Sequence, residues 1–328
     1  MSRVQIVSVG EGDDGARLDR WIKKRFPHVP NGRVQKALRK GEIRVDGGRA
    51  KGDTRLVAGQ DVRLPPFPDP TDLKPTEWLK PDEIAYARSL VIYEDDDVIA
   101  FNKPAGLAVQ GGSKTTKHLD RLLSAFGQDD KRPRLVHRLD KDTSGVLVAG
   151  KTLAASAKLA KAFQARETEK YYWGVVVGVP HPRTGEVKGF VKKGLSAAQG
   201  DREQMVAADH GEPGAQYALT RYTVAANAGQ KASWVVMRPI TGRTHQLRVH
   251  MAGFGYAIVG DRKYICDRET PGELPHQLHL HARRLVLPMG RDRLVIEAPL
   301  PDHMRKTFEA LGFDEDLIDE DATAEDLA

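Results

Sequence analysis

The hydrophobic positions near the N-terminus recur at helical spacing. Four of them follow the pattern i, i+3, i+4 and i+8, which predicts one face of a short helix: Leu18, Trp21, Ile22 and Phe26. A second helix with Val34 and Leu38 facing inward is predicted to be capped by Asn31 and stopped by Gly41. The next stretch, Glu-Ile-Arg-Val-Asp-Gly-Gly, alternates like a strand and runs into a Gly-Gly turn. Residues 1–64 are therefore predicted to form one compact unit.

Prolines dominate the following segment, residues 65–88. They are Pro65, Pro66, Pro68, Pro70, Pro75 and Pro81. Because proline lacks an N–H donor and disfavours helix and sheet hydrogen bonding, this segment is predicted to be an extended, semi-rigid linker.

From residue 89 the pattern changes to short apolar runs separated by turns. Runs of this length predict buried strands, and they are Leu90–Tyr93, Val98–Phe101, Val146–Val148, Trp173–Val177, Trp234–Met237 and Leu294–Ile296. Between them, residues 152–166 carry apolar side chains at helical spacing. Strands interspersed irregularly with helices predict an α+β fold, with a large mixed, mainly antiparallel sheet flanked by helices over residues 89–306.

Composition excludes several classes of protein. No apolar run approaches the roughly 20 residues that cross a bilayer, and the N-terminus lacks the long apolar centre of a signal peptide. The single cysteine, Cys266, excludes an intramolecular disulfide. These observations predict a soluble cytoplasmic protein without a membrane partner.

The net charge of +6 hides an uneven distribution. Nine acidic residues and no Lys or Arg follow Lys306, so residues 1–306 alone carry +15. A basic body indicates a polyanionic partner. The acidic residues 307–328 are predicted to form a mobile, solvated tail.

The exposed faces of the two N-terminal helices are basic. Residues 1–64 hold 15 Lys and Arg against 8 Asp and Glu, a net charge of +7. The candidate phosphate contacts are Arg17, Arg20, Lys23, Lys24, Arg33, Lys36, Arg39 and Lys40. Charge alone fits solvated helix surfaces equally well. However, ARLDRWIKKRF and VQKALRKGEIRVDG resemble the S4 RNA-binding domain, and the resemblance implies docking on phosphates without base readout.

The densest chemical signal is HRLDKDTSGVLV, residues 137–148. A polar, turn-prone cluster runs into a buried strand, which places reactive groups on a rigid support. Cations at Arg138 and Lys141 flank Asp140 and would keep its carboxylate ionised. From the residues alone, a well-bonded turn explains the cluster as well as a catalytic site does.

The same segment resembles H-R-L-D-x-x-T-S-G, the signature of the RluA/RluC/RluD family of pseudouridine synthases. Three further segments resemble family motifs in the same order: NKPAGLAVQ (102–110), KYYWGVVVG (170–178) and TGRTHQLRVH (241–250). VGDRKY and HLHARRL follow the last of them. The resemblance covers about residues 17–62 and 90–300. Gln110 and Gly174 stand where the family usually has His and Ala.

The resemblance implies a set of site residues. Asp140 would be the catalytic carboxylate, Tyr172 rather than Tyr171 the aromatic beside the uracil, and Arg243 the cation that pairs with the aspartate. Arg138 would enter the RNA and help hold the target nucleotide out of its helix. The remaining candidate RNA contacts in this domain are His137 and Lys170. Whether the aspartate attacks the sugar, attacks the uracil or removes a sugar proton stays open.

The family's reaction needs no cofactor or metal. GGSKTTKHLDRLL (111–123) is most similar to the RluC subgroup, which implies large-subunit ribosomal RNA or a pre-ribosomal particle as the partner and a monomeric enzyme. His276, His279 and His281 are interpreted as structural rather than metal-binding. Two alternatives remain: a non-catalytic RNA-binding or ribosome-assembly factor that keeps the fold, and a Mg²⁺-dependent nuclease, which would need several converging carboxylates.

Overall fold

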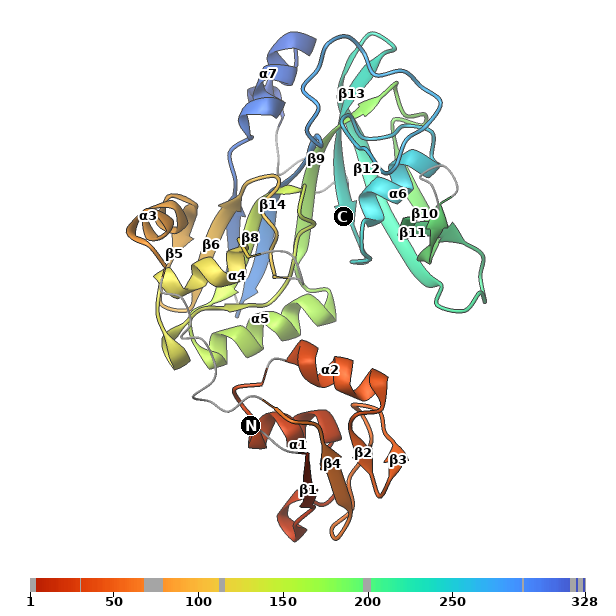
Figure 1. Cartoon of the computed structure of the whole chain (residues 1–328). Coiled ribbons are helices and arrows are strands. Elements are labelled where there is room, and N and C mark those ends of the chain that lie inside the picture. The colour runs from red at the N-terminus through yellow and green to blue at the C-terminus, as the bar shows by residue number, and fades with distance from the viewer. Residues whose placement is uncertain are drawn as a thin grey trace. The chain divides into compact units, whose positions relative to one another are not determined.

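The computed structural model describes residues 4–29, 31–67, 79–111, 116–196, 202–290 and 292–318, together with Thr323 and Leu327. The chain divides into two compact units, residues 1–78 and 79–328 (Figure 1). No helix in the described part of the chain is long and apolar enough to cross a membrane.

The N-terminal unit packs two helices on a small sheet. The helices are α1 (Leu18–Arg25) and α2 (Asn31–Lys40). The sheet has the order β1-β4-β2-β3, with bounds Gln5–Ser8, Asp61–Leu64, Arg44–Val45 and Gly48–Arg49. Its core contains the apolar positions predicted from periodicity, including Trp21 and Val34. Asn31 is the first residue of α2 rather than its cap, and Gly41 ends the helix with φ +68°.

The predicted linker is wrong at its C-terminal end. Residues 81–89 form α3 (Pro81–Ser89), and the helix belongs to the second unit. Pro81 stands at the start of the helix, where its missing N–H needs no partner. The Glu83 carboxylate accepts a hydrogen bond from Lys80 N at 3.0 Å and pairs with Arg121. The central part of the linker, residues 68–78, lies outside the described residues.

The second unit is built on one 11-stranded sheet with the order β11-β10-β12-β13-β9-β14-β8-β6-β5, to which β15 adds at β14 and β7 at β8. The strand bounds are Val91–Glu94 (β5), Val98–Lys103 (β6), Arg134–Leu135 (β7), Ser144–Gly150 (β8), Glu169–Val177 (β9), Thr184–Ser196 (β10), Arg202–Ala208 (β11), Gln216–Ala228 (β12), Ala232–Pro239 (β13), Leu280–Met289 (β14) and Asp292–Glu297 (β15). The β14–β8 pair is parallel, and the other described pairs in this sheet are antiparallel. The predicted α+β class with a mainly antiparallel sheet is confirmed.

Helices cover both faces of this sheet. They are α4 (Leu119–Leu122), α5 (Leu153–Ala165), α6 (Gln246–Gly253) and α7 (Asp302–Leu311). Alternate residues of β9 and β13 point to opposite faces. Tyr171, Trp173 and Trp234 pack with Phe308 of α7, whereas Val176 and Met237 pack with Leu247 and Met251 of α6. This alternation decides which of two adjacent tyrosines can reach the site described below.

The expectation of a mobile tail from residue 307 is also wrong in part. Thr307 and Phe308 are buried in α7, and Phe313 joins the same core. Leu327 is buried too, and its carbonyl oxygen accepts a hydrogen bond from Arg238 at 2.7 Å. Phe308, Phe313 and Leu327 thus share one core with Trp173 of β9 and Trp234 of β13. Residues 319–322, 324–326 and 328 lie outside the described residues.

Candidate active site

A cavity of about 310 Å³ lies where three distant segments of the second unit meet. Its walls include the loop before β8, the first half of β9 and the turn that leads into α6. The predicted residues Arg138, Asp140, Lys170, Tyr172 and Arg243 all line it. The fold therefore brings together the residues that the sequence motifs single out in this unit.

A buried lysine fixes the loop that carries Asp140. Lys103, at the end of β6, is fully buried, and its ammonium donates hydrogen bonds to the carbonyl oxygens of Pro104, Leu107 and Lys141. Burial lowers the pKa of Lys103 to about 7, against the opposing charges of Asp142 and Asp140. The Lys103 side chain thus ties the NKPAGLAVQ segment to Lys141, the residue that follows Asp140.

His137 anchors the other end of the same loop. Its Nε2 accepts a hydrogen bond from Val148 N at 2.9 Å, and its ring stacks on Phe163 with the centroids 4.4 Å apart. Burial lowers the pKa of His137 to about 3, so the ring is neutral. These contacts make His137 part of the scaffold, which argues against its predicted role as an RNA contact.

His281 and His279 are also held by hydrogen-bond partners within the fold. His281 on β14 lies 2.8 Å from Ser144 Oγ on β8 and 3.1 Å from Ala298 O. His279 contacts Gln277 O and Thr307 Oγ1. Each of the two buried rings has partners on both nitrogens. His276 is exposed at the wall of a separate cavity.

Tyr172 and Tyr171 have different surroundings. Tyr172 lines the cavity, and burial together with the negative charge of Asp140 raises its pKa above the usual range. Tyr171 points to the other face of the sheet, where its hydroxyl donates to Glu169 at 2.7 Å. The strand period of two therefore places Tyr172, and not its neighbour, beside the aspartate.

The predicted pairing of Arg243 with Asp140 is not found. Among the described residues no ion pair joins them, and Arg243 Nε instead donates to Tyr217 O at 3.0 Å. A buried cation that does line the cavity is Arg248 on α6, whose side chain is 3% exposed and whose positive charge interacts favourably with the Asp140 carboxylate. Arg243 lies before the helix and is partly exposed, whereas Arg248 is one of six consecutive buried residues within it.

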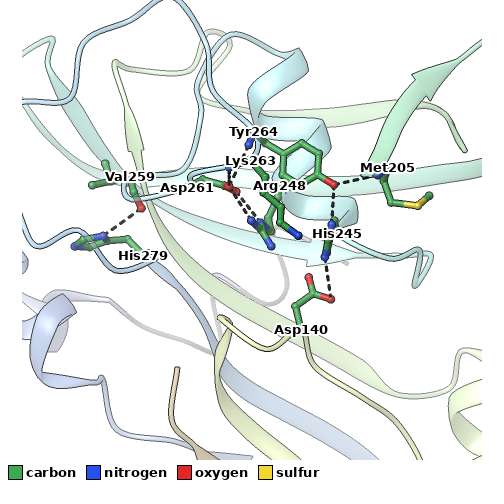
Figure 2. Close-up of polar contacts among 9 residues, drawn as sticks. All are labelled: Asp140, Met205, His245, Arg248, Val259, Asp261, Lys263, Tyr264 and His279. Carbon is green, nitrogen blue, oxygen red and sulfur yellow. Dashed lines mark hydrogen bonds and ion pairs between the residues drawn. The ribbon is translucent and has the colours of Figure 1, made fainter. Parts of the chain in front are cut away.

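Arg248 is fixed by a bidentate ion pair. Its Nε and Nη2 each lie 2.7 Å from a carboxylate oxygen of Asp261, a fully buried side chain (Figure 2). Asp261 also accepts from the backbone N–H groups of Lys263 and Tyr264. The Tyr264 ring lies 5.1 Å from the guanidinium. Because Asp261 is itself held by these hydrogen bonds, it fixes the position of the Arg248 guanidinium near Asp140.

The chain is similar to known proteins over most of its length. Residues 97–253 match the family model described as RNA pseudouridylate synthase. The ribosomal large subunit pseudouridine synthase C of Rickettsia bellii is 35% identical over 89% of this chain and 96% of its own length. That of Vibrio vulnificus is 33% identical over 94% of this chain and 97% of its own length.

The chain belongs to the pseudouridine synthase family. In addition, the solved structure of human RNA pseudouridylate synthase domain containing 4 matches with a TM-score of 0.58 and 28% identity, over 70% of this chain and 97% of that one. The matched family segment runs from β6 to α6 and includes Asp140, Tyr172 and Arg248. The protein is therefore an isomerase, a pseudouridine synthase.

Within this pseudouridine synthase, sequence reasoning missed four residues of the site. Arg248 and His245 stand in TGRTHQLRVH, and Asp261 and Tyr264 in VGDRKY. Both motifs are recognisable in the sequence, but Arg243 is the one residue in them with a predicted role. Six consecutive residues of α6, 246–251, are buried, so Arg248 is buried although the helix has no single apolar face. A buried arginine needs a partner, and Asp261 of the next motif provides it.

Proposed function

We propose that this pseudouridine synthase modifies uridines of large-subunit ribosomal RNA and that Asp140 is the reacting carboxylate. The reaction breaks the bond from N1 of uracil to C1′ of ribose and forms a bond from C5 to C1′. C5 loses a proton and N1 gains one, so no redox equivalent is consumed. The observation that carries the proposal is the cavity in which Asp140 lies with Tyr172 and Arg248. The names of the similar proteins support the choice of RNA.

The cavity is suited to a base taken out of its helix. A uridine inside a helix exposes neither C1′ nor C5 to a carboxylate, so it must be flipped, at a cost of a few kcal/mol. Tyr172 offers a flat apolar surface for the uracil. Arg138 is exposed at the cavity, where its guanidinium can fill the space that the base leaves in the RNA. Lys170, close to Arg166, adds positive charge at the same wall.

The N-terminal unit supports a docking role on phosphates. Six of the eight predicted contacts are exposed on its helices: Arg20, Lys23, Lys24, Lys36, Arg39 and Lys40. Four of the eight are engaged within the unit: Arg17 pairs with Asp19 and Arg33 with Glu42, each at 2.7 Å, Lys24 pairs with Asp13 at 3.1 Å, and Lys23 donates to Pro27 O at 2.7 Å. The better candidates for RNA contacts are therefore the exposed Arg20, Lys36, Arg39 and Lys40.

The two alternative functions have less support. A nuclease would need several acids converging on one site, and the described residues contain no group of three or more His, Cys, Asp or Glu arranged to hold a metal ion. A non-catalytic assembly factor would not need a preserved Asp140 beside Tyr172 and Arg248. Pseudouridine mapping of total cellular RNA from cells with the wild type, with Asp140→Asn and without the protein tests the proposal. Sites in large-subunit RNA that disappear in both deficient strains are expected, and an unchanged map would contradict it.

The two tyrosines of β9 are expected to respond differently to truncation. Tyr172→Ala should lose catalysis while the protein stays folded and binds RNA, and Tyr172→Phe should bind RNA like the wild type. Tyr171→Ala should instead cost roughly 3–5 kcal/mol of stability, because it empties a packed core position. Turnover and urea unfolding of the three variants measure this. Loss of activity in Tyr171→Ala alone, with none in Tyr172→Ala, would contradict the assignment.

Removal of residues 1–78 is expected to weaken RNA binding and raise KM without destroying the active site. Each Lys or Arg that neutralises a phosphate contributes roughly 0.7–0.9 to the slope of log affinity against log salt. Loss of three or four such phosphate contacts should reduce the magnitude of this slope by about two to four units. The cut belongs at residue 79, because α3 is part of the second unit. An unchanged slope and KM in the truncated enzyme would mean that the basic helices are only solvated surface.

A further inference from the structure

His245 holds an uncommon backbone conformation at the cavity. It precedes α6 with φ 54° and ψ 19°, the left-handed region, which residues other than glycine seldom adopt. The turn is fixed by Gln246, whose Oε1 accepts from Arg243 N at 3.0 Å and from Thr241 Oγ1 at 2.7 Å. Backbone strain held in place by surrounding hydrogen bonds is a reason to look for a role of the strained residue.

Tyr264 connects His245 to the backbone of β11. The Met205 N–H donates to the Tyr264 hydroxyl oxygen at 3.2 Å, and the same hydroxyl lies 2.6 Å from His245 Nδ1 (Figure 2). Burial raises the pKa of Tyr264 to about 12, so the phenol keeps its proton. Within the described part of the chain the hydroxyl has no other partner, so it donates its proton to Nδ1.

The hydrogen bond from the Tyr264 hydroxyl selects one tautomer of the His245 imidazole. A neutral imidazole that accepts at Nδ1 carries its proton on Nε2. Burial lowers the pKa of His245; the Asp140 and Asp261 charges oppose this shift, and those of Arg248 and Lys263 add to it. Nε2 lies 3.9 Å from Asp140 Oδ1 (Figure 2). The N–H bond is therefore presented to the carboxylate.

We propose that His245 is a positioning residue for the reaction, with Tyr264 fixing its tautomer so that the Nε2–H orients the Asp140 carboxylate. The inference rests on the proposed function, because it requires Asp140 to be the reacting group. The present separation is longer than a hydrogen bond, and contacts of catalytic groups commonly shorten only in the substrate complex. In the other tautomer a nitrogen lone pair would face the carboxylate and repel it.

The first test removes one oxygen atom. Tyr264→Phe retains the aromatic ring beside the Arg248 guanidinium but removes the hydroxyl that donates to His245 Nδ1, so that the His245 tautomer is no longer fixed. We expect kcat on a large-subunit RNA transcript to fall about 10-fold, with KM within about twofold. ¹⁵N NMR of His245 should show protonated Nε2 in the wild type and a mixture of tautomers in the variant. The matched control is Tyr222→Phe, which loses a similar hydroxyl contact, to Pro182 O at 2.8 Å, at a residue that does not line the cavity, and it should keep wild-type kcat.

The second test replaces the imidazole by amides of two lengths. Asn tolerates the left-handed backbone and places its amide near the position of Nδ1, so His245→Asn should fold but lose about 30-fold in kcat. Gln can place an N–H near the position of Nε2, and His245→Gln should stay within about fivefold of the wild type. Thermal unfolding of both variants checks that the turn survives. A purely structural role predicts the opposite order, because Asn fits this backbone better than Gln.

Two results would overturn the inference: equal kcat for His245→Asn and the wild type, or a single tautomer retained in Tyr264→Phe at full activity. Asp140→Asn is assayed alongside to separate the two proposals. If Asp140→Asn is active, the proposed function itself fails. If it is inactive while the His245 and Tyr264 variants match the wild type, only the positioning role fails.

Discussion

Asp140→Asn is expected to abolish the conversion of uridine to pseudouridine and to leave the fold and RNA affinity close to those of the wild type. The substitution is nearly isosteric and removes only the charge that the reaction requires. The loop does not depend on that carboxylate, because Lys103 and His137 hold it through backbone groups. Single-turnover conversion of a large-subunit RNA transcript, measured beside a binding isotherm, tests the expectation. Activity within tenfold of the wild type, about 1.4 kcal/mol of barrier, would contradict it.

Asp142→Asn is the matched control for this variant. Asp142 belongs to the same loop and is exposed, and it does not line the cavity. Its substitution changes the net charge by the same amount and should leave turnover near the wild-type level. Equal loss in both variants would indicate that the charge of the loop matters rather than a specific carboxylate.

Arg248→Ala is expected to cost both stability and activity. The substitution leaves Asp261 fully buried without its cation, and loss of one partner of a buried ion pair costs about 3–5 kcal/mol. Asp140 loses its buried counter-charge in the same step. Urea unfolding and turnover below the unfolding transition measure the two effects. Arg243→Ala, which removes a partly exposed side chain bonded to one carbonyl oxygen, should change stability by less than about 1 kcal/mol.

A double variant separates these two roles of Arg248. Arg248→Met combined with Asp261→Asn removes both charges and retains an oxygen acceptor for the N–H groups of Lys263 and Tyr264. It should recover much of the lost stability, since a neutral pair avoids an unpaired buried charge. Turnover should stay low. Recovery of full activity together with stability would show that Arg248 serves the fold alone.

The errors in the domain boundaries have a common origin. Six prolines suggested a linker up to residue 88, yet Pro81 begins a helix because only the interior of a helix excludes proline. The dense acids after Lys306 suggested a mobile tail, yet Phe308, Phe313 and Leu327 are buried. Both predictions were based on the most frequent residue type of the segment, proline or acid. Whether a segment packs on the domain depends instead on a few apolar side chains.

Local pattern by itself located part of the architecture. Helical spacing located α1, α2 and α5, and the six apolar runs located β5, β6, β8, β9, β13 and β15, because both signals depend on residues close together in the chain. Asp140 was singled out by the resemblance of HRLDKDTSGVLV to a family signature and not by local pattern. The resemblance also favoured Tyr172 over Tyr171, and of the two only Tyr172 lines the cavity, since a strand sends neighbouring side chains to opposite faces.

Only the tertiary structure decided which groups surround Asp140. Arg243, His245 and Arg248 lie in one short motif, and no local rule says which of them points to a loop about a hundred residues earlier. The packing of α6 turns Arg248 inward to Asp261 and leaves Arg243 on a backbone carbonyl. The contact of Tyr264 with β11 sets the ring of His245. The physical reason is that orientation at a site depends on long-range packing and on partners for buried charges, which a one-dimensional pattern does not contain.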